Sequence, residues 1–383
     1  MRNMVDRLLL GILVVLSASV LVTGGLAVYL TLARQGGAVA GDEVAPTVGV
    51  TTTVTTVAPD EPRIAFISDE AGEVALYVID ADGSNQRRVS DPERDFCIRP
   101  YWSPDGRYVA YLERLDSDTG DLPNIGVWVS AADGGEHTRV SQAISRVLGT
   151  DPMWSPDGTR LAFASLSEPM GGEPLTSTIH VAALDGGVEQ RFPLPWVIEY
   201  AVWSPAGDEW LLVTDGGVYT LSGEEGEIVE VFVGARTANW SPDGEEVVVG
   251  DQASNSVLVV GQDLEPRLIA ELKMDPVEVA WSPDGAHIAV TAAQRYQQGY
   301  GDALYIVTLE TGDIVPVIEN EGWALWPNWS PDGSQLLFTM GPPVWRTGSD
   351  LPYADLWVYD VASGRQEQLT LGEGFEGLGI WSP

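Results

Sequence analysis

The feature that most constrains this chain is a tripeptide, Trp-Ser-Pro, which recurs seven times. The copies begin at Trp102, Trp154, Trp203, Trp240, Trp281, Trp329 and Trp381, at intervals of 52, 49, 37, 41, 48 and 52 residues. Five copies continue into Asp-Gly, the copy at Trp203 reads Ser-Pro-Ala-Gly, and the last copy ends the sequence. A period of about 40 to 50 residues filled with short strands is typical of the blades of a β-propeller.

The residues around each copy predict four short strands. Ser-Pro-Asp-Gly suits a type I turn, because Ser and Asp bond locally, Pro presets φ at about −65° and Gly favours the last position. An apolar strand such as residues 160–163 follows the turn, and a second strand such as residues 76–80 comes next. An Asp-Gly hairpin, as at Asp82-Gly83, then leads into a further strand. With the strand that ends on the tryptophan, each unit makes one antiparallel blade of four strands.

The two ends of the repeat region complete each other. Residues 63–67 read as a strand that follows a turn but has no Trp-Ser-Pro before it, whereas the last Trp-Ser-Pro has no strand after it. We expect the C-terminal strand to join the first blade and close the ring, which removes free sheet edges. The sequence therefore predicts an all-β, seven-bladed β-propeller over residues 62–383. Six or eight blades are the alternatives.

These repeats, with Trp-Ser-Pro-Asp-Gly, an Ile-Ala-Phe-like strand and Leu-Tyr-Val-x-Asp, resemble the WD-like propeller repeats of the TolB family. The resemblance covers the whole propeller region and implies a propeller fold and a scaffolding role in the cell envelope. TolB has an α/β domain before a six-bladed propeller, and there is no room for that domain between Arg34 and Pro62. The resemblance therefore transfers the fold and not membership of the Tol-Pal complex. Similar propellers cap prolyl-oligopeptidase-like peptidases, but this sequence has no Gly-x-Ser-x-Gly and no hydrolase domain.

An uncharged segment precedes the repeats. Leu8 to Ala33 contains 26 residues without a charge, which as a helix would exceed the hydrocarbon core of about 30 Å. The prediction is one transmembrane signal anchor over residues 8–33. Ala38-Val39-Ala40 has the small-x-small form of a signal-peptidase site, so cleavage after Ala40, which would secrete the protein, is the alternative.

The flanking residues predict the orientation of this anchor. Arg2 and Arg7 lie on its N-terminal side, so residues 1–7 form a cytoplasmic tail and the propeller lies outside, in the periplasm or the extracellular space. Residues 34–61 are rich in Thr, Val, Gly and Pro, which predicts a flexible linker. The expected location is the cytoplasmic membrane, crossed once.

Charge and cysteine content narrow the classes of partner. There are 20 basic and 56 acidic residues, a net charge of −36, which would repel nucleic acid. The same excess attracts cations, so weak calcium binding stays open although no site is predicted. Cys97 is the only cysteine, so no internal disulfide can form, and a structural thiol is expected.

Two sets of residues could suggest chemistry, and both are expected to be structural. Five carboxylates occupy the same turn position around the ring: Asp105, Asp157, Asp243, Asp284 and Asp332. The three histidines, His137, His180 and His287, fall at different levels of different blades, so their convergence on one metal ion is not expected. The sequence therefore predicts no catalytic residue, no metal site and no cofactor.

The face opposite the Ser-Pro-Asp-Gly turns is the predicted binding face, because it receives all the insertions. The insertions run from Glu113 to Ile125, Leu166 to Ser177, Ala292 to Asp302 and Met340 to Ala354. Aromatic residues outside the repeat register fall there, and these are the predicted partner-binding residues: Trp196, Tyr200, Tyr296, Tyr300, Trp323, Trp326, Trp345 and Tyr353. The alternative is that they pack loops onto neighbouring blades.

Together these features predict a non-catalytic binding or scaffolding propeller, anchored in the cytoplasmic membrane, that engages a protein or an envelope polysaccharide. The protein is expected not to be an enzyme. The alternative is a propeller enzyme of the sugar-lyase or hydrolase type with a central pocket. That alternative requires Asp95, Arg99, Glu199 and His137 to converge at the mouth of the channel.

Overall fold

The computed structural model describes residues 62–383, apart from 73, 92–96, 115–123, 142–143, 146–150, 168–173, 223–225, 297–298, 320–321, 343–352 and 373. The predicted cytoplasmic tail, transmembrane anchor and linker lie outside the described residues. Within the described part of the chain, no helix has the length and apolar character needed to cross a membrane.

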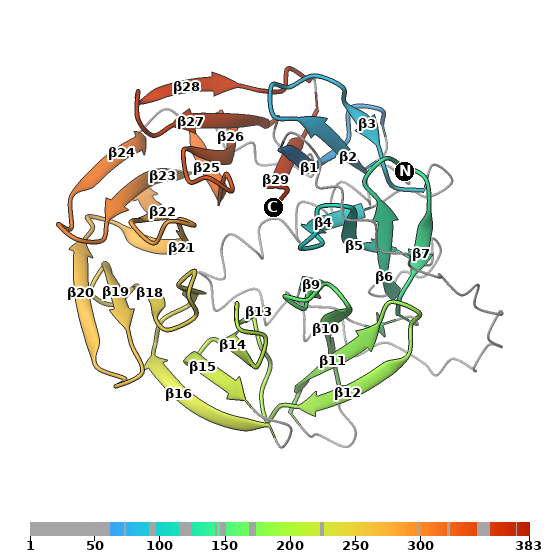
Figure 1. Cartoon of the computed structure of the whole chain (residues 1–383). Helices are drawn as coiled ribbons and strands as arrows, with labels where there is room; N and C mark the ends of the chain where they lie inside the picture. The colour runs from blue at the N-terminus through green and yellow to red at the C-terminus, as the bar shows by residue number, and fades with distance from the viewer. Residues whose placement is uncertain are drawn as a thin grey trace.

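Seven antiparallel sheets surround a common centre (Figure 1). We number the sheets as blades and give their strands from the inside outwards. Blade 1 contains β29 (Glu376–Trp381), β1 (Arg63–Ser68), β2 (Ala75–Asp80) and β3 (Arg87–Arg88), and blade 2 contains β4 (Cys97–Trp102), β5 (Tyr108–Arg114), β6 (Asn124–Ala131) and β7 (His137–Arg139), with β8 (Ile144–Ser145) also paired to β6. Blade 3 contains β9 (Met153–Trp154), β10 (Arg160–Leu166), β11 (Ser177–Ala183) and β12 (Val188–Pro193).

The remaining four blades follow the same order. Blade 4 contains β13 (Tyr200–Trp203), β14 (Glu209–Val213), β15 (Gly217–Ser222) and β16 (Glu227–Val233), and blade 5 contains β17 (Thr237–Trp240), β18 (Val247–Asp251), β19 (Ser256–Val260) and β20 (Pro266–Glu271). Blade 6 contains β21 (Asp275–Trp281), β22 (His287–Tyr296), β23 (Gly299–Thr308) and β24 (Ile314–Ile318), and blade 7 contains β25 (Trp323–Trp329), β26 (Gln335–Gly341), β27 (Asp355–Asp360) and β28 (Arg365–Gln368). The predicted seven-bladed propeller of four-stranded blades is confirmed, and among the described strands β8 is an addition to blade 2.

The C-terminal strand closes the ring. β29 pairs antiparallel with β1, and Trp381 lies opposite Ile64. Beyond the last pair, the Ser382 amide donates to the Arg63 carbonyl oxygen at 2.7 Å, and the Arg63 amide donates to Ser382 Oγ at 2.9 Å. The first blade is therefore built from both ends of the repeat region, as the sequence predicts.

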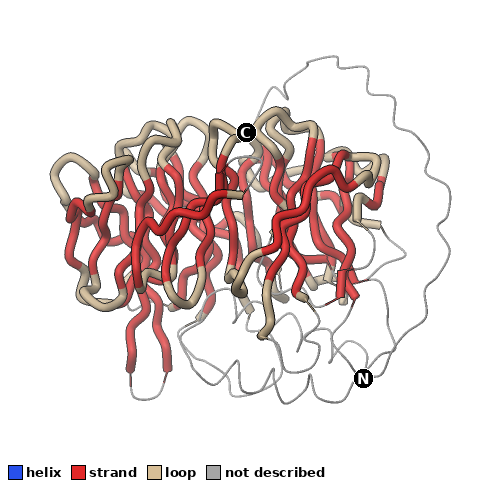
Figure 2. The backbone as a smooth tube through the Cα atoms, turned by 90° about the horizontal axis from the view of Figure 1, so that it is seen from below, coloured by secondary structure: helices blue, strands red, loops and turns tan. Residues whose placement is uncertain are grey.

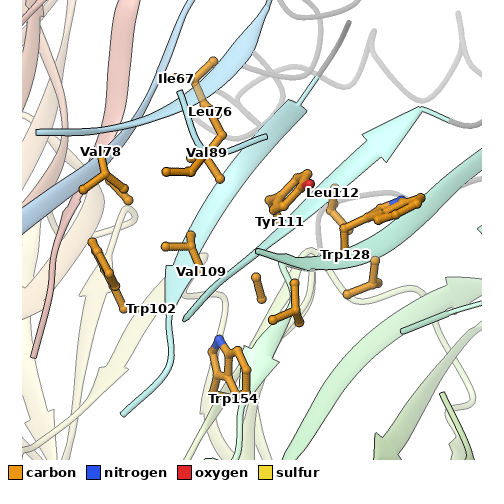
Figure 3. Close-up of a cluster of buried hydrophobic side chains, with 14 of the residues drawn as sticks. Ile67, Leu76, Val78, Val89, Trp102, Val109, Tyr111, Leu112, Trp128 and Trp154 are labelled. Atoms are coloured by element: carbon orange, nitrogen blue, oxygen red, sulfur yellow. The ribbon is translucent and has the colours of Figure 1, made fainter. Parts of the chain in front are cut away.

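The core lies between the blades, because each sheet packs against two neighbours and needs apolar side chains on both faces. Figure 3 shows part of it, where Val78 of blade 1, Trp102 and Val109 of blade 2 and Trp154 of blade 3 belong to one cluster. The largest fully buried side chains include Tyr111, which lies on β5 in the same cluster. Burying one such side chain contributes about 1.5–3 kcal/mol.

The two faces of the ring differ. Every Trp-Ser-Pro-Asp-Gly turn follows the end of an inner strand, so these turns share one face, which we call the turn face. In Figure 2 the hairpin of β22 and β23 extends well beyond the other strands on the opposite face, the insertion face. Each of the four predicted insertions contains residues outside the described ones.

Candidate functional site

The inner strands of the seven blades surround the centre of the ring (Figure 1). They are β29, β4, β9, β13, β17, β21 and β25, and we call their residues, with those that directly precede each strand, the inner rim. Each inner strand ends on a motif tryptophan at the turn face. Residues that come three to six positions before that tryptophan consequently lie towards the insertion face.

The motif tryptophans join the blades. The Trp102 indole Nε1 donates to the Ile380 carbonyl oxygen at 3.0 Å, in the preceding blade. Trp154, Trp240 and Trp329 make the equivalent bond to the residue before the preceding motif tryptophan, at 3.0, 3.3 and 3.0 Å. Their repeated presence is therefore explained by packing around the ring.

The five repeated aspartates lie in the turns. In the turn after Trp154, Ser155 Oγ donates to Asp157 Oδ1 at 2.5 Å, and the Thr159 amide donates to the same oxygen at 3.0 Å. The hydrogen bond from Ser155 is the largest cause that lowers the pKa of Asp157 to about 2. The Ser-to-Asp bond recurs for Asp105, Asp243, Asp284 and Asp332 at 2.6 to 2.7 Å. A carboxylate held in this way stabilises the turn.

The three histidines lie in three different blades. His137 Nδ1 is hydrogen-bonded to Ser130 Oγ on the neighbouring strand of blade 2, and His180 Nε2 lies 2.8 Å from Ser165 Oγ in blade 3. The His287 ring is 6.2 Å from the Trp329 ring. Among the described residues, no three His, Cys, Asp or Glu side chains are grouped as a metal site requires.

Two of the predicted partner-binding aromatics pack between blades, Trp323 as a buried and Tyr200 as a partly buried residue. Trp323 is only 3% exposed. The Tyr200 hydroxyl accepts a hydrogen bond from the Ala238 amide at 2.6 Å and donates to the Ala238 carbonyl oxygen at 3.0 Å. Burial is the main cause that raises the pKa of Tyr200 to about 12. Packing between blades, the alternative interpretation, therefore holds for these two residues.

The other predicted aromatics are placed differently. Trp196 is partly buried, 4.9 Å from the Tyr219 ring, and Trp326 is also partly buried, whereas Tyr353 is 58% exposed. Tyr296 and Tyr300 pair β22 with β23, but their side chains are not among those described, and Trp345 lies outside the described residues. A partner-binding role for this set stays a prediction.

An unusual titratable group lies at the insertion-face end of the inner rim. Glu199 directly precedes β13, and its amide donates to the Val213 carbonyl oxygen at 2.7 Å. Burial is the main cause that raises the pKa of the Glu199 carboxyl to about 7. Arg236 of blade 5 opposes this shift, and Asp215 adds to it. A carboxyl with such a pKa can gain and lose a proton near neutrality.

Arg236 is a residue that the sequence analysis missed. It stands four positions before Trp240, as Glu199 stands four positions before Trp203, so the repeat register alone places both at one level of adjacent blades. Glu199, by contrast, belongs to the set required by the alternative, enzymatic interpretation. Of the other residues in that set, His137 lies on the outer strand β7, away from the inner rim. Asp95 and the side chain of Arg99 are outside the described part of the structure.

The family models match nearly the whole propeller. A model described as the TolB beta propeller domain matches residues 60–278, more than half of the chain. A second model, the dipeptidyl peptidase IV N-terminal region, matches residues 282–375.

Two similar curated proteins are named as peptidases. The uncharacterized peptidase YuxL of Bacillus subtilis is 26% identical over 204 residues, which cover 50% of this chain and 29% of YuxL. Dipeptidyl-peptidase 5 of Porphyromonas endodontalis is 22% identical over 276 residues, 70% of this chain and 33% of that protein. The Tol-Pal system protein TolB of Thioalkalivibrio sulfidiphilus is 36% identical over 83 residues, 21% of this chain and 18% of TolB. The chain thus spans about a third or less of each of these proteins.

Solved structures show the same fold. TolB from Acinetobacter baumannii aligns with a TM-score of 0.53 at 18% identity and covers 84% of this chain and 66% of its own. An oligogalacturonate lyase in complex with manganese gives a TM-score of 0.56 at 14% identity, over 73% and 82%. The β-propeller domain of the Trilobed protease from Pyrococcus furiosus gives 0.57 at 14% identity, over 82% and 95%.

These similarities correct one expectation and support another. The prediction that the protein is not an enzyme is contradicted, because relatives named as peptidases and the match to the dipeptidyl peptidase IV N-terminal region point to an enzyme. The missing Gly-x-Ser-x-Gly was weak evidence, since it bears on a hydrolase domain and not on a propeller. The predicted TolB-like repeat is confirmed by the match over residues 60–278. The chain belongs to the TolB β-propeller domain family.

Proposed function

We propose that this chain is the substrate-binding propeller of a peptidase-type enzyme, and that Glu199 and Arg236 hold a peptide at the insertion-face end of the inner rim. The observation that carries the proposal is the electrostatic interaction between these two side chains of adjacent blades. A carboxyl with its pKa raised by burial to about 7 lies within electrostatic reach of a guanidinium from the next blade.

The chemistry of the pair suits a peptide. The Glu199 carboxylate can accept hydrogen bonds from an ammonium or amide N–H, and the Arg236 guanidinium can donate to a carboxylate or a carbonyl oxygen. A peptide presents both kinds of group. Because Glu199 and Arg236 directly precede the inner strands β13 and β17 of adjacent blades, the rigid ring fixes their relative position.

The similar proteins support the enzyme class. Two curated relatives are named as peptidases, and the matched part of a solved protease is its propeller domain. An oligogalacturonate lyase shares the fold, so a sugar substrate is the competing class. The pair of opposite charges favours the peptide, because a zwitterionic chain carries both complementary groups, whereas an oligogalacturonate carries carboxylates only.

Calorimetric titration of the full chain with tetra-alanine tests this proposal. At pH 8 Glu199 is ionised, so we expect tetra-alanine with a free amino terminus to bind about 10-fold more tightly than its N-acetylated form. At pH 5.5 Glu199 is protonated, and the difference between the two peptides should disappear. Glu199→Gln should remove the difference at both pH values.

Glu230→Gln is the matched control, because Glu230 lies on β16, the outer strand of the same blade. It should bind both peptides as the unmodified protein does. The proposal is wrong if neither peptide binds, or if Glu199→Gln and Arg236→Gln bind them as tightly as the control. Binding of oligogalacturonate in place of the peptides would favour the sugar class.

Partners and location are part of the same proposal. The similarity to TolB proteins supports a protein partner. Contact with a polysaccharide and display on the outer side of the cytoplasmic membrane rest on the sequence alone. Detection of the full chain in the membrane fraction, with protease sensitivity from the outer side, would test the location.

A further inference from the structure

Four adjacent inner strands, β21, β25, β29 and β4, each have one residue more than the next strand at an irregularity in their pairing, and in three of them the irregularity takes the same form. In β25, β29 and β4, which belong to blades 7, 1 and 2, two residues oppose one residue of the next strand. The paired residues are Trp326-Pro327 opposite Phe338, Leu378-Gly379 opposite Phe66, and Arg99-Pro100 opposite Tyr111. Such a β-bulge re-aims the side chains of an inner strand. The inner strands β13 and β17 of blades 4 and 5 pair without any shift.

Two bulge residues adopt a backbone conformation that their side chains disfavour. Trp326 has a φ of 56° and Leu378 a φ of 55°. The left-handed conformation costs a residue with a Cβ about 1–2 kcal/mol, and Trp326 also precedes a proline, which restricts it further. Each of the two stands three positions before its motif tryptophan, so the same strain occurs at one level of adjacent blades.

Side chains from other strands hold both bulges. Glu278 Oε2, on β21 of blade 6, accepts a hydrogen bond from the Trp326 amide at 2.8 Å. The Leu378 amide donates to Oγ1 of Thr339, a fully buried residue of β26, at 3.2 Å. Strain that the surrounding structure stabilises in this way is a feature of ligand-binding sites.

The held side chains are apolar and pack against a core cluster that contains Phe375, which is itself only 1% exposed. The Trp326 ring meets the Phe375 ring edge-on, with 6.4 Å between centroids and 81° between planes. Trp326 and Leu378 are both partly buried against the same core cluster as Phe375, and neither is fully covered. We call Trp326, Phe375 and Leu378 the bulge sector.

The bulge sector lies across the ring from Glu199 and Arg236. In a closed ring of seven blades, blade 1 faces blades 4 and 5, and Figure 1 shows β29 and β25 on the opposite side of the centre from β13. All these residues stand three or four positions before a motif tryptophan, except Phe375, which directly precedes β29. One end of the inner rim thus has Glu199 and Arg236 on one side and, on the other side at a similar level, apolar side chains next to Glu278.

The geometry points to the bulge sector as the subsite for an apolar side chain, aromatic or branched aliphatic, of the peptide held by Glu199 and Arg236. This inference rests on the proposed function and names the class of peptide. Trp326 provides the ring face against which the apolar side chain packs. Glu278 is a positioning residue that keeps this ring in place through the Trp326 amide.

Tripeptides of the form Ala-X-Ala, with X as Phe, Leu or Ser, test the subsite by calorimetric titration of the full chain at pH 8. Burial of a Phe or Leu side chain contributes about 1.5–3 kcal/mol, so the affinity for the Phe and Leu peptides should exceed that for the Ser peptide roughly 10-fold or more. Trp326→Ala should reduce this preference to less than about 3-fold. Glu278→Ala, which retains the tryptophan but removes the acceptor of its amide, should reduce the preference in the same direction.

Val202→Ala is the matched control, because Val202 is a partly buried apolar residue of the regular inner strand β13. It should retain the preference, and the thermal midpoint of each variant establishes that it is folded. If Trp326→Ala does not fold, Leu378→Asn takes its place, since Asn tolerates the left-handed conformation. An unchanged preference in the folded variants overturns the subsite but leaves the proposed function intact. Absence of binding by all three tripeptides to the unmodified protein overturns both.

Discussion

The indole Nε1 of Trp154 lies 3.0 Å from the main-chain carbonyl oxygen of Tyr101 and donates a hydrogen bond to it across the boundary between blades 3 and 2. The same bond joins three other pairs of blades. At Trp203, Trp281 and Trp381 the equivalent nitrogen is buried but has no acceptor among the described residues. The indole hydrogen bonds that join neighbouring blades are therefore unevenly distributed around the ring, although all seven copies of the motif have the same tryptophan.

Trp154→Phe should destabilise the protein more than Trp203→Phe. Both changes remove the same atoms from a buried site, but only the first breaks a hydrogen bond and leaves the Tyr101 carbonyl oxygen without that donor. The difference in free energy of unfolding should be about 1–3 kcal/mol, measured by urea denaturation at pH 7. An equal decrease in the free energy of unfolding for the two variants would show that the indole hydrogen bond does not stabilise the contact between blades.

Restoring the missing aspartate of blade 4 should stabilise its turn. Ser204 Oγ has no Asp two positions later and donates instead to Asp208 Oδ1 at 3.2 Å, whereas Ser155 Oγ reaches Asp157 at 2.5 Å. Ala206→Asp should raise the free energy of unfolding by about 0.5–1.5 kcal/mol, and Asp157→Ala should lower it by a similar amount. A thermal midpoint that moves in the same direction for both variants would contradict this account of the turn.

The hydroxyl of Tyr200 should contribute more to stability than that of a surface tyrosine. It is hydrogen-bonded to the amide and the carbonyl oxygen of Ala238 in the next blade. Tyr200→Phe leaves both main-chain groups buried without this partner and should cost about 1–3 kcal/mol by chemical denaturation. The exposed Tyr353 supplies the control, because Tyr353→Phe should change the free energy of unfolding by less than about 0.5 kcal/mol.

Glu199 should make the stability of the ring fall as pH rises. Its pKa is about 7 in the folded protein against an ordinary value of 4.5, so folding disfavours the ionised form. The cost is absent below about pH 4.5, grows between pH 4.5 and 7, and is complete above pH 7. A shift of this size corresponds to roughly 3 kcal/mol.

Glu199→Gln should therefore be more stable than the unmodified protein at pH 8, by up to roughly 3 kcal/mol, and of similar stability at pH 4.5. Urea denaturation at the two pH values measures both differences. A gain that is equal at pH 4.5 and pH 8 would show that the Glu199 carboxyl is not the titrating group.

The number of blades and the aspartate turns could be predicted because each depends on residues close together in sequence, and the closing strand because the repeat is incomplete at both ends. A Trp-Ser-Pro-Asp-Gly turn forms from its own side chains, as Ser155 and Asp157 show, and the tryptophan spacing counts the turns. The missing first motif and the surplus last one imply the pairing of β29 with β1, which Ile64 and Trp381 make. Repetition made these features predictable, because the same local interactions recur in each copy of the motif.

The candidate site could be predicted only in part. Glu199 and Arg236 share a register position, which the spacing reveals, but the burial that raises the pKa of Glu199 depends on how blades 4 and 5 pack. The packing of Tyr200 and Trp323 between blades depends on the same long-range contacts. The similarity to proteins named as peptidases was not predicted, because no motif within the propeller repeats indicates it.

The repeat thus determines the ring, its blade number and its closure, because turns and hairpins are local and recur. The difference between equal-looking copies is a property of the folded ring. Trp326 and Glu278, 48 positions apart in the sequence, meet only because β25 and β21 are inner strands of neighbouring blades. Long-range packing selects which motif tryptophans find an acceptor, which inner strands bulge and which carboxyl stays protonated near neutrality. The spacing of the motifs in the sequence does not predict these differences between the blades.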